Sequence, residues 1–134
     1  MTSKITYLGD LRTELTHISS GQTIITDAPI DNQGKGLAFS PTDLAATSLG
    51  ACMITIMGIS ARNHGLNIDG TELEITKIMA SNPRRIQEIE IKVIMPHGNF
   101  LKKDRVLLEA AGRTCPVAFS LHPDINQNIT FIWK

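Results

Sequence analysis

Two cysteines, Cys52 and Cys115, carry the most nucleophilic side chains of this 134-residue chain. Cys52 lies in the uncharged stretch LGACMITIMG, residues 49–58, and Cys115 directly precedes Pro116 in RTCPVAFSL. Free cysteine is among the most buried residue types, so one interpretation is that both cysteines only fill the core. The other is a redox pair: one thiolate reacts with an oxidant to give a sulfenic acid, and the second thiol condenses with it to a disulfide.

The position of Cys115 favours ionisation of its thiol. A proline suits the first position of a helix, so Pro116 predicts that Cys115 lies at or near a helix N-cap. Free backbone N–H groups and the positive end of the helix dipole favour a thiolate at such a position.

Cys52 has no activating charge on its own helix. Apolar surroundings raise the pKa of a thiol, so a cation from another segment or another chain has to favour its thiolate. By position the candidates are Arg12, Arg62 and Arg113. Arg62 lies ten residues further along the helix, about 15 Å away, and is set aside as an activating partner. Arg12 and Arg113 both remain open.

The helix that carries Cys52 has clear start and stop signals. Ser40 is the predicted N-cap, Pro41 the first helical residue, and Asp43 completes an S-x-x-D capping box. With Gly65 just beyond the end, the helix is predicted from about Pro41 to His64. It carries no charge between residues 44 and 61 and is expected to be buried on all sides. Its glycines, serines and threonines favour a core helix over a membrane span.

The remaining pattern predicts short strands and two short helices. Alternation predicts strands at residues 4–8, 11–18 and 22–27, a loop at 28–39, and a long hairpin of 71–81 and 84–96 with one charged, solvated face. Helical segments are predicted at 102–112 and 115–121, and a closing strand at 128–134. This order indicates an α+β fold, a single domain over residues 1–134 with antiparallel sheets packed on the long cysteine-bearing helix. Because one small sheet cannot cover that helix on all sides, we expect a homodimer.

Composition excludes several classes of partner. The 13 basic and 13 acidic residues cancel and form no basic block, so neither nucleic acid nor an anionic membrane is an expected partner. The N-terminus shows no secretory signal, which predicts a cytoplasmic protein with reduced thiols. The cysteines lack the spacing of a zinc site, and no metal or cofactor is expected. Only 4% of residues are aromatic, which favours aliphatic ligands.

Two segments carry a resemblance to a known family. SPTDLAATSLGACM at residues 40–53, followed by CPVAFSLHPDI at 115–125, resembles the paired cysteine motifs of the osmotically inducible protein C and organic hydroperoxide resistance (OsmC/Ohr) family. The resemblance implies an intertwined homodimer with active sites at the subunit interface. It also implies that Cys52 is the peroxidatic thiol and Cys115 the resolving thiol, acting on organic hydroperoxides with fatty or aromatic tails and re-reduced by an external dithiol.

One motif departs from the family pattern. Where the peroxidases of the family have Asn-Pro-Glu, with a glutamate that orients an arginine onto the thiolate, this chain has Ser40-Pro41-Thr42. Asp43 is one position off and is interpreted as part of the capping box. The primary hypothesis is a peroxidase that works through a Cys52 sulfenate and a Cys52–Cys115 disulfide in oxidative stress defence. The alternative is a non-enzymatic dimer of this fold that binds an apolar small molecule in its interface pocket.

Overall fold

Helix α1 (Pro41–Asn63) is the longest element of the computed structural model, which describes residues 1–134. It ends one residue before the predicted end. The capping box is present, since the Ser40 Oγ accepts the Asp43 N–H at 3.0 Å and the Asp43 Oδ2 accepts the Ser40 N–H at 3.0 Å. Gly65 follows the helix with φ of 68°, a conformation that glycine adopts without strain. The predicted start and stop signals of α1 are therefore confirmed.

The chain forms two compact units, Met1–Ala45 and Ala46–Lys134, with the boundary inside α1. The single domain expected over residues 1–134 stays a prediction. The first unit holds a three-stranded antiparallel sheet in the order β1-β2-β3 and a short 3₁₀ helix. Its elements are β1 (Ser3–Gly9), β2 (Arg12–His17), β3 (Thr23–Asp27) and η1 (Ile30–Asn32). All three predicted N-terminal strands are confirmed.

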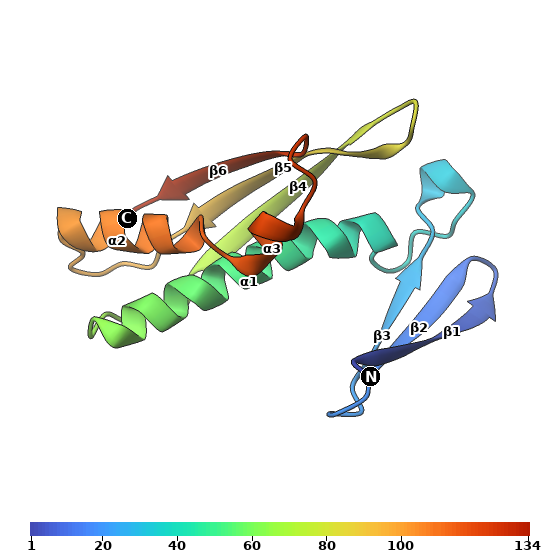
Figure 1. The fold of residues 1–134 in the computed structure, drawn as a ribbon, viewed down its shortest axis with the longest axis horizontal. Helices are drawn as coiled ribbons and strands as arrows, with labels where there is room; N and C mark the ends of the chain where they lie inside the picture. The colour runs from blue at the N-terminus through green and yellow to red at the C-terminus, as the bar shows by residue number, and fades with distance from the viewer. The chain divides into compact units, whose positions relative to one another are not determined.

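The second unit combines most of α1 with a mixed sheet and two further helices (Figure 1). Strands β4 and β5 pair antiparallel, whereas β5 and β6 pair parallel. Helices α2 and α3 lie between β5 and β6 in the chain, and this long connection allows the last strand to run in the same direction as β5. The elements are β4 (Glu72–Ala80), β5 (Arg85–Ile94), α2 (Lys102–Gly112), α3 (Pro116–Ser120) and β6 (Asn126–Ile132). The predicted α+β class is confirmed, with one parallel pair in place of a wholly antiparallel sheet.

One face of the β4–β5 hairpin supplies the core and the other is polar. Leu73 pairs with Val93 and Ile75 with Ile91 on the inner face. The outer face carries charged pairs of which Glu74 and Lys92, 3.9 Å apart, are an example. The predicted solvated, charged face of the hairpin is therefore present.

Helix α1 buries one face and leaves the opposite one open in the single chain. Leu49, Met53 and Met57 are fully buried in the core. On the other side Thr55 is exposed and Ile59 is 52% exposed. The expectation that α1 is enclosed on all sides is therefore not met within one chain. By length and composition α1 is apolar enough to cross a membrane, and in this structure its buried face packs in the hydrophobic core.

Two glycines of α1 provide a matched test of this packing. A Cβ on Gly50 would lie 2.6 Å from the Ile75 Cδ1, whereas a Cβ on Gly58 would meet nothing within 4 Å. Alanine is favoured over glycine inside a helix by about 1 kcal/mol. We therefore expect Gly58→Ala to raise the free energy of unfolding by about 0.5 to 1 kcal/mol, and Gly50→Ala to give no such gain because Ile75 has to move. Urea unfolding of both variants checks this, and equal gains would contradict the packing described.

Candidate functional site

The two cysteines meet in the core of the second unit. Cys52, on α1, is half-buried on the flank of the helix beside the buried Met53. Cys115 is completely buried, at 0% exposure, and belongs to the same hydrophobic cluster. Both are free thiols, and Cys52 is a close enough neighbour of Cys115 to influence the pKa of its thiol. Folding thus brings together two residues that lie 63 positions apart.

Cys115 is the N-cap of α3, as its place before Pro116 predicts. Its backbone is extended, with φ of −75° and ψ of 149°, and Pro116 occupies the first turn. The Cys115 Sγ accepts the backbone N–H of Ala118 at 3.4 Å. The backbone of the first turn of α3 therefore fixes the position of the Cys115 thiol, which lies in the core.

Burial outweighs the helix end in setting the charge of Cys115. Desolvation raises the pKa of the Cys115 thiol above its ordinary value, and the hydrogen bond and charge of Cys52 raise it further. The N–H groups of Ala118 and Val117 oppose this shift without reversing it. The N-cap position therefore does not make Cys115 a thiolate. At neutral pH this side chain is a protonated thiol.

The two candidate cations have partners elsewhere. The Arg113 guanidinium lies 5.3 Å from the centroid of the Phe131 ring, in a cation–π contact. Arg12, in the first unit, forms a two-pronged ion pair with Asp27, with Nε–Oδ1 of 2.7 Å and Nη2–Oδ2 of 2.8 Å. Asp27 is 1% exposed and also accepts the Leu37 N–H at 3.1 Å.

Asp27 is the partner of Arg12 that the sequence did not identify. Arg12 and Asp27 are directly paired in the antiparallel register of β2 and β3, near the open ends of the two strands. The sequence does contain a signal for this pair. A tight turn after residue 17 places the start of one predicted strand opposite the end of the next, and Arg12 and Asp27 stand at these two positions. The carboxylate that pairs with Arg12 is that of Asp27. Thr42, at the position where the peroxidases of the family have a glutamate, has no carboxylate.

Asp43 belongs to the capping box of α1, as interpreted from the sequence. No three His, Cys, Asp or Glu side chains gather as ligands for a metal ion anywhere in residues 1–134.

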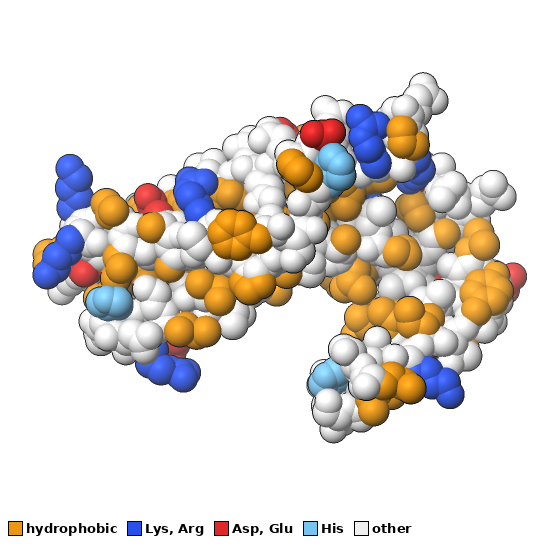
Figure 2. All heavy atoms as spheres, viewed as in Figure 1, with side chains coloured by type: hydrophobic (Ala, Val, Ile, Leu, Met, Phe, Trp, Pro, Cys, Tyr) orange, Lys and Arg blue, Asp and Glu red, His pale blue; other side chains and the backbone are white.

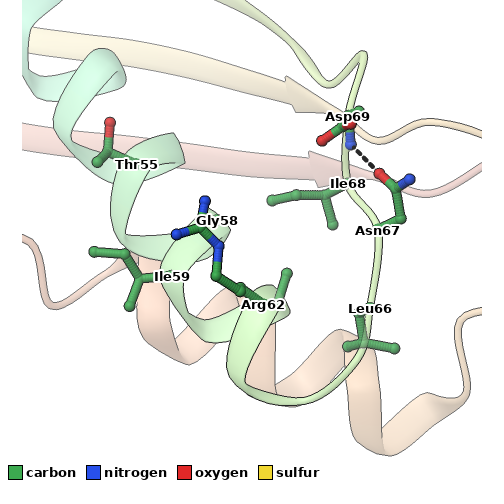
Figure 3. A pocket seen from close by; sticks show the side chains of 9 residues that line it. Thr55, Gly58, Ile59, Arg62, Leu66, Asn67, Ile68 and Asp69 are labelled. Atoms are coloured by element: carbon green, nitrogen blue, oxygen red, sulfur yellow. Dashed lines mark hydrogen bonds between the residues drawn. The ribbon is translucent and has the colours of Figure 1, made fainter.

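A cavity opens beside the last turns of α1 (Figure 3). Its volume is about 580 Å³, and all of its walls come from the second unit. One wall is α1 from Thr55 to Arg62, and the other is the loop from Leu66 to Asp69. Nothing in the sequence predicts this cavity, because the loop that forms its second wall carries no periodic signal.

Comparison with known proteins agrees with this fold. Residues 34–130 match the family of OsmC-like proteins. A putative osmotic stress induced and detoxification response protein from Psychrobacter arcticus is 52% identical, over 98% of this chain and 96% of that one, with a TM-score of 0.95. No curated protein matches the chain.

More distant solved structures share the fold. An organic hydroperoxide resistance protein from Legionella pneumophila, also described as a predicted redox protein, has 13% identity and a TM-score of 0.75, over 98% of this chain and 96% of that one. A putative organic hydroperoxide resistance protein from Vibrio cholerae, with captopril bound in one of its active sites, has 15% identity and a TM-score of 0.73, over 98% and 91%. The fold is thus one that this chain shares with OsmC-like and organic hydroperoxide resistance proteins. The chain belongs to the OsmC-like family.

The Arg12–Asp27 pair predicts a stability change in acid. The hydrogen bond from Arg12 holds the pKa of Asp27 below its ordinary value; burial opposes this shift and the Leu37 N–H adds to it. A lowered pKa in the folded state stabilises the fold above about pH 4, the range where the unfolded aspartate is ionised. This contribution disappears as the pH falls through the lower, folded-state pKa.

The measurement is the midpoint of urea unfolding as a function of pH. The native protein is expected to lose stability below about pH 4 more steeply than Asp27→Asn, which cannot titrate at this position. Parallel curves for the two proteins would show that the pair contributes nothing to folding.

Proposed function

We propose that the protein is a thiol-dependent peroxidase that reduces organic hydroperoxides in oxidative stress defence. The observation that carries the proposal is the contact of two reduced cysteines, Cys52 of α1 and Cys115 before α3, within an apolar core. Family membership supports it, since relatives of this fold are named organic hydroperoxide resistance proteins.

The difference in burial between the two thiols supports different roles for them. Cys52 is half-buried and within reach of a small molecule, whereas Cys115 is fully enclosed. Burial also raises the pKa of Cys115, so this sulfur stays protonated while it waits for its partner to be oxidised. These two differences support Cys52 as the attacking thiolate and Cys115 as the resolving thiol.

The reaction proceeds in three steps. The Cys52 thiolate attacks the terminal oxygen of the hydroperoxide, the O–O bond breaks, and the alcohol leaves with a proton taken up from solvent, so that Cys52 becomes a sulfenic acid. The Cys115 sulfur then attacks the Cys52 sulfur, and the hydroxyl leaves as water with the Cys115 proton. An external dithiol reduces this disulfide and is itself oxidised to a disulfide.

The surroundings of Cys52 favour hydroperoxides with apolar tails. Cys52 packs against the hydrophobic core cluster, and its helix neighbours Leu49 and Ile56, three residues before it and four residues after it, are aliphatic. Such a wall binds an alkyl or aryl group, which hydrogen peroxide does not have. We expect the reaction to take place in the cytoplasm, where thiols are kept reduced. The activating cation, Arg12 or Arg113, stays a prediction.

Thiol counting tests the mechanism. One equivalent of cumene hydroperoxide added to the reduced protein is expected to remove both free thiols and to give a Cys52–Cys115 disulfide, detected by peptide mapping. Cys52→Ser should keep its remaining thiol, because Cys115 is buried and protonated. Cys115→Ser should stop at a sulfenic acid that dimedone captures. Thiols that persist for minutes in the native protein would reject the peroxidase and favour the non-enzymatic binding protein.

The first unit supports a homodimer. Ile5, Leu15 and Ile24 lie directly opposite one another on one face of the β1-β2-β3 sheet. Ile5 is 61% exposed and Ile24 48% exposed, and Figure 2 shows hydrophobic side chains on the surface of this part of the chain. A small sheet with an open apolar face needs a covering surface. A second copy of the chain, in a two-fold dimer, is the covering that we propose.

Light scattering after size-exclusion chromatography tests the dimer. The native protein should have the mass of two chains, and a double variant with Ile5→Glu and Ile24→Glu should have the mass of one, because two charges would otherwise be buried at the interface. Lys4→Glu, on the other face of β1, is the matched control and should remain dimeric. A native protein with the mass of one chain would contradict the proposal.

A further inference from the structure

A second cavity of the second unit lies between the loop that follows α1 and the loop that follows β5. Its volume is about 390 Å³, and Figure 1 shows the two loops at the same end of the unit. Helix α1 ends at Asn63, and neither α1 nor the β1-β2-β3 sheet contributes a residue to the lining. The cavity is therefore built without the two surfaces that the proposed dimer would cover.

The charge of the lining favours a cation. Asp69 is the only acidic residue that lines the cavity, and no lysine or arginine does. The Asp69 carboxylate forms no salt bridge and accepts no hydrogen bond. Arg62 lines the cavity on the other side of the same loop, but not this one. His97 is also in the lining. Because histidine side chains are largely neutral at pH 8, Asp69 then gives the cavity one negative charge.

The end of α1 adds to this negative potential. Gly65, which lines the cavity, lies two residues after Asn63, the last residue of the helix. The carbonyl groups of a helix C-terminus carry a partial negative charge and favour a cation within about one turn. A carboxylate and a helix end thus attract the same kind of ligand from the same side.

The uncharged groups of the lining suit a nitrogen that carries hydrogen atoms. Asn67 and Asn99 contribute side-chain amides, whose oxygens accept hydrogen bonds from N–H donors. The Asn67 oxygen already accepts the Asp69 N–H at 2.8 Å, as Figure 3 shows, and it has a second lone pair. This bond also holds Asp69 and Asn67 in one fixed loop.

An aromatic ring lies in the opposite wall. Phe100 lines the cavity, and its ring centroid is 5.2 Å from that of Trp133. A Cβ on Gly98 would stand 2.7 Å from the Phe100 Cε2, so the absence of a side chain there lets the loop pack closely on the ring. An aromatic ring attracts a cation and also contacts an alkyl chain.

We propose that this cavity binds a small molecule with a protonated primary amine, and that the Asp69 carboxylate pairs with the ammonium group. The amide oxygens of Asn67 and Asn99 accept its remaining N–H groups, and Phe100 contacts the adjoining alkyl part. A volume of about 390 Å³ is within the ordinary range of small-molecule sites. Because Asp69 is exposed, its ion pair is weak, and the expected Kd is in the millimolar range. Neither cysteine lines the cavity, so this inference is independent of the proposed peroxidase function.

The test compares n-butylamine with 1-butanol at pH 8, where the amine is protonated. In the native protein the amine is expected to give saturable shifts of the backbone amide resonances of residues 66–69 and 97–100, followed by NMR. The alcohol, which has the same chain and no charge, should bind about fivefold more weakly. Shifts that do not saturate, or equal affinities for amine and alcohol, would overturn the inference.

Two variants and a control locate the site. Asp69→Asn should weaken amine binding about threefold to fivefold and leave the fold intact, because the bond to Asn67 is made by the backbone N–H. Phe100→Leu should weaken it about threefold. Asp124→Asn, an exposed aspartate of another loop, is the matched control and should change nothing. Equal amine affinities of the native protein and Asp69→Asn would contradict the proposed ion pair. Thiol loss with cumene hydroperoxide should be the same in both, which separates this site from the cysteines.

Discussion

Burial of one face of α1 against the inner face of the β4-β5-β6 sheet determines where the reactive groups lie. Burial of Leu49, Met53 and Met57 stabilises the fold by about 1.5 to 3 kcal/mol for each side chain. This stabilisation fixes which face of α1 is turned toward the sheet. Cys52, next to Met53 on the helix, is thereby kept at the edge of the core. Cys115 enters the same core from the start of α3. A disulfide needs close sulfur atoms, and this packing supplies the proximity.

Two opposing effects act on the charge of Cys115, and their balance bears on the roles proposed for the two cysteines. The N–H groups of α3 favour a thiolate, whereas complete burial and the neighbouring Cys52 favour the neutral thiol. Burial is the larger effect, so Cys115 is both less accessible than Cys52 and held as a neutral thiol. A resolving thiol benefits from this arrangement, because it does not compete with Cys52 for the oxidant and retains the proton that is later released in water.

The chain has no net charge, so pairing decides which cations are available for function. Arg12 is held by the buried Asp27, and Arg113 lies over Phe131. Arg62 alone among these three has no partner side chain, and it stands beside a cavity. The same residue type thus has three different environments in one chain.

Local signals in the sequence were sufficient for much of the fold. The capping box at Ser40, the glycine after α1 and the alternation in the strands each act over a few residues, and each is present in the structure. The two cysteine motifs were enough to indicate the family. The parallel pairing of β6, the raised pKa of Cys115 and the partner of Arg12 were decided only by the tertiary structure. Each of these depends on contacts with residues distant in sequence or on burial, which no short stretch of residues specifies.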